Sequence, residues 1–187
     1  MQRLSETGQG EAPRRVLICY ASTEGQTRKI CRFAAEQLIA QGRSVEMLPA
    51  GDAAEVALAA FDAALLAGSV HLGRLQPELA EFCGEHAGTL NRMTSLFLVV
   101  SLAAAGTDPA ERADLDRIAD TFATAAGWRP GRVAHVAGAF RFSAYGPLRR
   151  WAMRWIAWRK GQRIAPGQDR EYTDWAALAA LLKGWPA

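Results

Sequence analysis

The chain has 187 residues, of which 50% are hydrophobic and 22% are charged, a composition that predicts one globular domain with a sizeable core and excludes a disordered chain or a disulfide-framework miniprotein. The formal net charge of +3 conceals an uneven distribution. No acidic residue stands between Asp120 and Asp169, a stretch with nine basic residues, so the rest of the chain carries a net charge of −6.

The residue pattern predicts strands that alternate with helices behind a polar tail. Residues 1–14 are expected to be a flexible N-terminal tail, and one domain is expected over 15–187. Apolar runs predict buried strands, and helical spacing of apolar residues predicts helices. In chain order these elements are strand 16–21, helix 27–41, strand 44–48, strand 61–68, helix 77–86, strand 95–101, helix 109–126, strand 132–140 and helix 174–183.

This alternation is typical of βαβ units in an α/β fold. Right-handed crossovers then produce a doubly wound, five-stranded parallel sheet, for which the strand order 2-1-3-4-5 is expected. Residues 145–168 do not fit the alternation, and we interpret them as a basic helical insertion before the last helix.

Cysteine usage and hydropathy bear on the compartment. The three cysteines form no C-x-x-C pair and the three histidines are scattered, so a reducing cytosol is expected and no metal site. The polar residues before position 15 lack the apolar core of a signal peptide, and the longest apolar runs are far shorter than a membrane span. A soluble or peripheral cytoplasmic protein is therefore expected.

The loop after the first predicted strand has the composition of a phosphate site. Ser22–Thr27 (S-T-E-G-Q-T) joins that strand directly to a helix, and the N-terminus of a helix attracts anions through its N–H groups and its dipole. The loop has no lysine, so it is not a Walker A motif, and it is not G-x-G-x-x-G either. A phosphate monoester suits it; a simple helix cap without a ligand is the alternative.

Five segments together resemble the flavodoxin-like, quinone-dependent protoporphyrinogen IX dehydrogenase family of bacteria, and the resemblance runs from Arg15 to the C-terminus. These are S-T-E-G-Q-T at Ser22–Thr27, A-G-S-V-H-L-G at Ala67–Gly73, W-R-P at Trp128–Pro130, A-G-A-F-R-F at Ala137–Phe142 and Y-T-D-W at Tyr172–Trp175. The resemblance implies a flavodoxin-like fold, FMN as cofactor, and oxidation of protoporphyrinogen IX to protoporphyrin IX in haem biosynthesis. Six electrons would leave in three two-electron steps and pass to a membrane quinone.

The resemblance also implies where FMN would bind. Ligands of open α/β sheets bind outside the carboxyl ends of the strands, and three loops are expected to meet there. The second and third loops offer no aromatic residue to stack on the flavin, which leaves a face open to a flat substrate. The expected cofactor-binding residues are Ser22, Thr23, Glu24, Gly25, Gln26, Thr27, Ser69, Val70, His71, Leu72, Gly73, Ser101, Leu102 and Ala103.

Residues 147–160 combine tryptophans with arginines and are expected to form a short amphipathic helix. Ordinary packing on the domain, an anionic membrane surface and nucleic acid are the three interpretations. The resemblance favours peripheral association with the inner membrane, where the quinone is confined, and not nucleic acid. The expected substrate or membrane contacts are Arg74, Arg141, Arg149, Arg150, Trp151, Arg154, Trp155 and Trp158.

No residue is assigned as an obligatory catalytic acid or base, because a flavin carries the redox chemistry itself. Three other functions remain open at this point. A flavodoxin-like electron carrier, a flavin-dependent NAD(P)H–quinone reductase and a membrane-associated scaffold without flavin would each be compatible with the fold.

Overall fold

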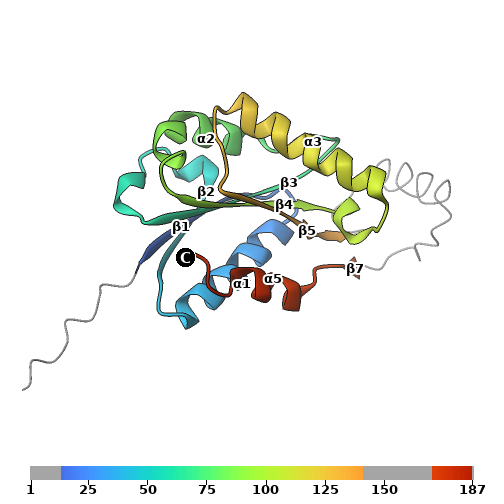
Figure 1. Cartoon of the computed structure of the whole chain (residues 1–187), viewed down its shortest axis with the longest axis horizontal. Coiled ribbons are helices and arrows are strands. Elements are labelled where there is room, and N and C mark those ends of the chain that lie inside the picture. Colours follow the sequence, from blue (N-terminus) through green and yellow to red (C-terminus); the bar gives the residue numbers. More distant parts are fainter. Residues whose placement is uncertain (1–13, 141–169, 187) are drawn as a thin grey trace, which may run out of the picture.

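A computed structural model describes residues 14–140 and 170–186, which form a parallel sheet between two layers of helices (Figure 1). The sheet has the order β2-β1-β3-β4-β5, and every neighbouring pair is parallel. This confirms the predicted fold class and strand order. The strands are β1 (Arg15–Ala21), β2 (Ser44–Pro49), β3 (Ala63–Ser69), β4 (Thr94–Ser101) and β5 (Arg132–Ala137).

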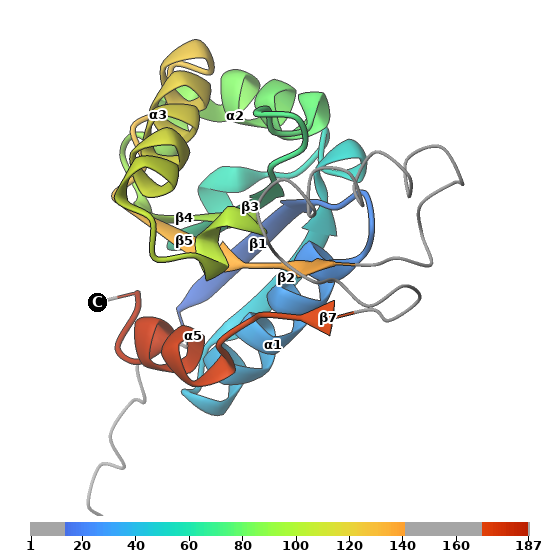
Figure 2. The ribbon, with the colours of Figure 1, turned by 90° about the vertical axis from the view of Figure 1, so that its right-hand side faces the viewer.

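The helices cover both faces of the sheet (Figure 2). Two helices lie on one face, α1 (Gln26–Ala40) and α5 (Trp175–Leu182), and two on the other, α2 (Pro77–Leu90) and α3 (Pro109–Ala125). Short 3-10 turns follow β2, precede β3 and follow β4, at η1 (Ala50–Asp52), η2 (Leu58–Ala60) and η3 (Ala103–Ala105). Helix α2 continues four residues beyond its predicted end.

Burial on both faces explains the near-continuous apolar runs of the strands. Alternate side chains of β1 belong to two separate clusters. Leu17 and Cys19 pack toward α2 and α3, whereas Val16 and Ile18 pack toward α1 and α5. The central strands β3 and β4 are buried along almost their whole length.

Trp128, the first residue of the W-R-P segment, is part of this core. The side chain of Trp128 is 1% exposed and its ring centroid lies 5.2 Å from that of Phe97. The side chain of Asn91 holds the same turn, since it accepts from the backbone N–H of Arg129 at 2.7 Å and donates to the carbonyl of Gly127 at 2.9 Å. The segment precedes β5, so it lies at the amino end of the strands and not at the end where ligands bind.

The predicted strand over 132–140 is wrong in its last part, because the chain leaves the sheet at Gly138. The Gly138 N–H donates to the Ser101 carbonyl at 3.0 Å, and a Cβ there would lie 3.2 Å from the Val100 side chain. Residues beyond it form β6 (Ala139–Phe140), which pairs antiparallel with β7 (Arg170–Glu171). This second, two-stranded sheet leads into α5.

Two sequence-based predictions concern residues outside the described part of the chain. These are the basic helical insertion over 145–168 and the N-terminal tail, except for Arg14. Among the helices that the structure describes, none combines the length and the hydropathy that a membrane crossing requires.

Candidate functional site

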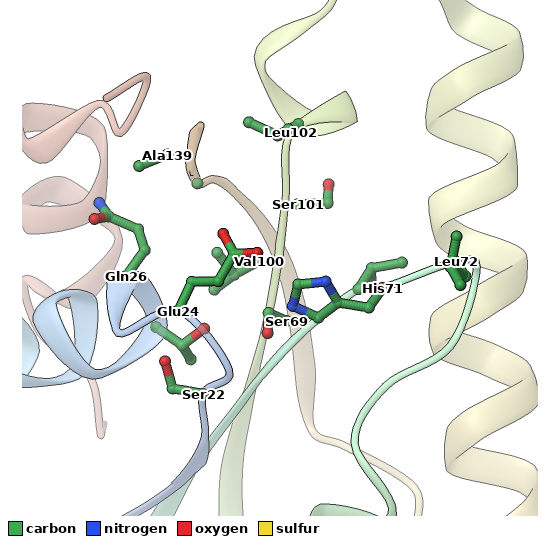
Figure 3. Close-up of a pocket in the computed structure, with 13 residues that line it drawn as sticks. Ser22, Glu24, Gln26, Ser69, His71, Leu72, Val100, Ser101, Leu102 and Ala139 are labelled. Atoms are coloured by element: carbon green, nitrogen blue, oxygen red, sulfur yellow. The ribbon is translucent and has the colours of Figure 1, made fainter. Parts of the chain in front are cut away.

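A pocket with a volume of about 210 Å³ opens at the carboxyl ends of the central strands (Figure 3). The β1–α1 loop, the ends of β3 and β4, and the start of β6 form its walls. Its lining residues are Ser22, Glu24, Gln26, Thr27, Ser69, Val70, His71, Leu72, Val100, Ser101, Leu102, Gly138 and Ala139. The three loops that the sequence predicted to meet at this edge therefore do so.

The β1–α1 loop is wound so that a helix N-terminus faces the pocket. Ser22 Oγ accepts a 3.0 Å hydrogen bond from the Gly25 N–H, and Gly25 has a φ of 85°, a conformation that favours glycine. Helix α1 then begins at Gln26, and no acidic side chain stands in its first turn. N–H groups of a first turn have no acceptor within their own helix, so this loop presents donors to an anion.

Gln76, which the sequence analysis did not single out, braces this loop against the next one. Its side-chain amide donates to Thr23 Oγ1 at 3.2 Å and to Ser69 Oγ at 2.5 Å, and its carbonyl accepts from the Ser69 N–H at 3.1 Å. Close packing at Gly68 makes this possible, because a Cβ there would lie 2.6 Å from the Leu75 side chain. In the sequence, the only sign of this contact is that Gln76 follows Gly68 by eight positions.

A second brace comes from the Y-T-D-W segment. Gln26 Nε2 donates to Thr173 Oγ1 at 3.0 Å, and that hydroxyl donates to the Ala137 carbonyl at 2.7 Å. Gln26 and Thr173 are 6% and 9% exposed. Asp174 then caps α5 by accepting from the Ala177 N–H at 2.9 Å. The segment thus fixes the start of α5 and the first turn of α1 together at the end of β5.

The loop after β3 ends in a tight two-residue turn at the pocket mouth. The backbones of His71 and Arg74 exchange hydrogen bonds of 2.8 and 3.1 Å, and the residues between them, Leu72 and Gly73, have φ values of 51° and 76°. Leu72 is 95% exposed. Arg74, at the end of the turn, is exposed to solvent but is not among the residues that line the pocket.

The loop after β4 contributes a polar anchor and an apolar edge. Ser101 is buried, and its Oγ accepts a 3.1 Å hydrogen bond from the Ala104 N–H, which starts η3. Leu102 is 37% exposed at the rim. Among the residues that the structure describes, no Phe, Tyr or Trp side chain lines the pocket.

Not every predicted site residue lies on the pocket surface. Thr23, Gly25, Gly73 and Ala103 shape the loops but do not line the pocket, whereas Val100, Gly138 and Ala139 line it without having been predicted. Arg141, Arg149, Arg150, Trp151, Arg154, Trp155 and Trp158 lie outside the described residues.

Two titratable side chains extend into the pocket from opposite walls. Glu24 reaches in from the β1–α1 loop and His71 from the loop after β3 (Figure 3). Within residues 14–140 and 170–186, neither side chain has a hydrogen-bond or ion-pair partner. The nearby Lys29 is paired with Glu171 at 2.5 Å instead. An anion in this pocket would therefore be held by backbone N–H groups and hydroxyls, with Glu24 as an opposing charge.

The cysteines take no part in the site. All three are buried and free, and burial raises the pKa of Cys19 to about 12. Burial, followed by the neighbouring Cys19, also raises the pKa of Cys31 and of Cys83. These thiols stay protonated at neutral pH, which makes them poor nucleophiles and poor metal ligands.

Comparison with known proteins gives one family and one group of named relatives. The flavodoxin domain family matches residues 17–164. Protoporphyrinogen IX dehydrogenase [quinone] of Escherichia coli K12 is 29% identical over 170 residues, which cover 90% of this chain and 93% of that protein. The protein of the same name from Leishmania major is 26% identical, over 91% of this chain and 74% of its own length. The resemblance predicted from the five sequence segments is thus confirmed.

Solved structures support the fold alone. Oxidised flavodoxin 2 of Bacillus cereus matches with a TM-score of 0.51 and 17% identity, over 79% of this chain and 99% of that one. The C101S mutant of flavodoxin from Pseudomonas aeruginosa matches with a TM-score of 0.50 and 18% identity, over 91% and 99%. Both matches support the fold described above.

Proposed function

Because this chain belongs to the flavodoxin domain family, we propose that its pocket binds FMN and that the protein oxidises protoporphyrinogen IX with a membrane quinone as electron acceptor. One observation carries the proposal. The β1–α1 loop presents a helix N-terminus with two hydroxyl side chains to a pocket at the carboxyl edge of the sheet, in a chain that is similar along 90% of its length to quinone-dependent protoporphyrinogen IX dehydrogenase.

The chemistry of the donors fits a flavin mononucleotide. The phosphate would bind at the first turn of α1, with Ser22 and Thr27 as hydroxyl donors and with the backbone N–H groups of the loop. Glycine at position 25, with its φ of 85°, keeps the loop backbone free of a side chain there. A single phosphate needs less neutralisation than a pyrophosphate, which agrees with the absence of a lysine from this loop.

The size of the pocket favours a cofactor that stays partly exposed. About 210 Å³ is below the roughly 300–1,000 Å³ of sites that enclose a small molecule. An isoalloxazine ring held here would keep an edge or a face accessible from solvent. Such access is what a two-electron acceptor requires when it meets a flat substrate and then a quinone.

When bound, FMN would act as the two-electron acceptor. The protein's own groups would position the flavin and the substrate and shield them from solvent. The small side chains at the end of β4 and the start of β6 leave room beside the ring. Ser69, fixed by Gln76, and Ser101, fixed by the turn that follows it, set the spacing of the two flanking loops. His71 and Glu24 are the titratable groups of the described lining, and either could receive a proton released by the substrate.

Membrane association is the part of the proposal that depends on sequence alone. A quinone dissolved in the bilayer requires the protein to reach the membrane surface, and Trp151, Trp155 and Trp158 alternate with arginines in the acid-free stretch. Tryptophan suits the interfacial zone, and each basic residue near an anionic surface adds about 1 kcal/mol. We propose a cytoplasmic protein that binds the inner membrane peripherally. Its test is liposome sedimentation of a variant with alanine at these three positions.

An anaerobic single-turnover experiment tests the central assignment. The FMN-loaded protein is mixed with protoporphyrinogen IX in the absence of quinone, and the flavin absorbance is followed. The proposal predicts that the yellow colour of oxidised flavin is lost and returns on addition of a quinone. A protein that FMN cannot reconstitute would be a scaffold. A flavin that protoporphyrinogen does not reduce would indicate a carrier or, if NAD(P)H reduces it, a quinone reductase.

A further inference from the structure

The turn between His71 and Arg74 has an unexpected residue at its tip. In a two-residue turn with positive φ at both central positions, asparagine and glycine are favoured, because an L side chain crowds the backbone there. Gly73 satisfies this preference, but the other position is Leu72, with a φ of 51°. Leu72 is the one non-glycine residue with positive φ among those that the structure describes.

No packing offsets this strain. The Leu72 side chain is 95% exposed, so it buries almost no apolar surface within the domain. Strained residues of this kind persist where they serve a function. Leu72 lines the pocket at its outer rim, while the His71 ring points inward (Figure 3). Leu102 is 37% exposed on the neighbouring loop and lines the same pocket.

The turn also carries a positive charge. Arg74 is exposed, and none of the ion pairs among the described residues involves it. An exposed leucine beside an unpaired arginine complements a flat apolar molecule that bears carboxylates. A quinone ring is flat and apolar but has no carboxylate, so the charge distinguishes between the two reactants of the proposed reaction.

We propose that the turn over 71–74 recognises the porphyrinogen, with Leu72 packed on an apolar face of the tetrapyrrole and Arg74 paired with one of its carboxylates. This rests on the proposed function and deepens it. Because Leu72 lies at the outer rim of the pocket, its removal should weaken binding of the porphyrin more than binding of FMN. The strained leucine is retained for binding at the expense of stability.

The first experiment separates stability from binding at position 72. L72N keeps a residue that the turn tolerates and removes the apolar side chain, whereas L72M keeps the apolar side chain. We expect L72N to unfold at a higher temperature than wild type. Its KM for protoporphyrinogen IX and the Kd of the FMN-loaded protein for protoporphyrin IX, measured by fluorescence, should both rise about tenfold, the effect of losing one buried aliphatic contact.

Controls make the result specific. L72M should keep both constants within about twofold of wild type, and so should I39N, which removes an exposed aliphatic side chain at the far end of α1 (Ile39 is 57% exposed). In L72N the KM for the quinone should not change, and the Kd for FMN should rise by a smaller factor than the Kd for protoporphyrin IX. A Kd for protoporphyrin IX equal to that of wild type would overturn the proposal, as would an increase confined to the quinone KM.

The second experiment tests the charge. R74Q should weaken protoporphyrin IX binding severalfold at low salt and leave binding of protoporphyrin IX dimethyl ester unchanged, because the ester has no carboxylates. R92Q, at an exposed arginine beyond α2, should change the binding of neither protoporphyrin IX nor its dimethyl ester. Equal effects of R74Q on acid and ester would overturn the role of Arg74. If wild type forms porphyrin but both variants match it, this inference alone fails; if wild type neither binds nor forms porphyrin, the proposed function fails with it.

Discussion

Gln26 donates a 3.0 Å hydrogen bond to the hydroxyl of Thr173, 147 positions further along the chain, and that hydroxyl donates at 2.7 Å to Ala137. The three residues belong to the first turn of α1, the Y-T-D-W segment and the end of β5. Since Gln26 lines the pocket, this relay ties the shape of the proposed phosphate site to the return of the chain from β7.

The relay predicts that T173V weakens both the fold and FMN binding. Valine has nearly the shape of threonine, but it removes the hydroxyl that pairs with the buried Gln26 amide and with the part-buried Ala137 carbonyl. The loss in unfolding free energy should be about 1–3 kcal/mol, measured by urea denaturation. FMN affinity should fall, measured by fluorescence titration, because Gln26 is no longer fixed.

Two variants serve as controls for that change. T173S keeps the hydroxyl and should keep FMN affinity. E171Q removes only the exposed pair with Lys29, whose contribution should not exceed about 1 kcal/mol. If T173V bound FMN as tightly as wild type, the relay would have no influence on the phosphate loop.

Charge repulsion in the phosphate loop predicts that E24Q tightens FMN binding. The Glu24 carboxylate extends into the pocket with no cation beside it in the described structure. Removal of one negative charge near a phosphate should raise affinity roughly two- to fivefold at low ionic strength. The gain should shrink as salt is added. Weaker FMN binding in E24Q would mean that the carboxylate itself holds the cofactor.

The space around two glycines, Gly68 at the end of β3 and Gly84 in α2, predicts opposite effects on stability when each is changed to alanine. A Cβ at Gly68 would lie 2.6 and 2.8 Å from the side chains of Leu75 and Leu79, and Leu79 is fully buried. G68A should therefore cost about 1–3 kcal/mol of stability and displace Gln76. Gly84 lies in α2 with nothing within 4 Å of an added Cβ, so G84A should stabilise the protein by about 0.5–1 kcal/mol. Thermal unfolding compares the two, and equal effects would refute the packing argument.

The buried thiols predict slow chemical labelling. Because burial raises the pKa of Cys19 to about 12, and that of the other two in the same direction, little thiolate exists at neutral pH. A thiol reagent should label the native protein far more slowly than the denatured one. Rapid labelling of one equivalent in native conditions would identify an exposed cysteine and contradict the placement of these residues.

The sheet could be predicted because its signals are local. Apolar runs between turn formers marked all five strands, and their alternation with helices determined the order. The break at Gly138 could not be predicted in the same way, because a glycine inside A-G-A-F looks like any strand glycine. The Val100 side chain, which excludes a Cβ there, comes from another strand.

In the candidate site too, local features could be predicted from the sequence, whereas contacts between distant segments could not. Ser22 to Thr27 lie in one contiguous motif, so the composition of the loop indicated its chemistry. Gln76 and Thr173 act on that loop across 53 and 147 positions. Gln76 lies in none of the five segments, and the Y-T-D-W segment that contains Thr173 does not show by itself that it contacts the first turn of α1. The strain at Leu72 depends on a backbone angle, which V-H-L-G does not specify.

Quinone-dependent turnover is the most direct test of the proposed function. The FMN-loaded protein is incubated anaerobically with protoporphyrinogen IX and a quinone, and porphyrin fluorescence and quinone consumption are recorded together. The proposal predicts porphyrin formation that requires the quinone, with three quinones consumed for each porphyrin. FMN binding without any quinone-dependent porphyrin formation would contradict it.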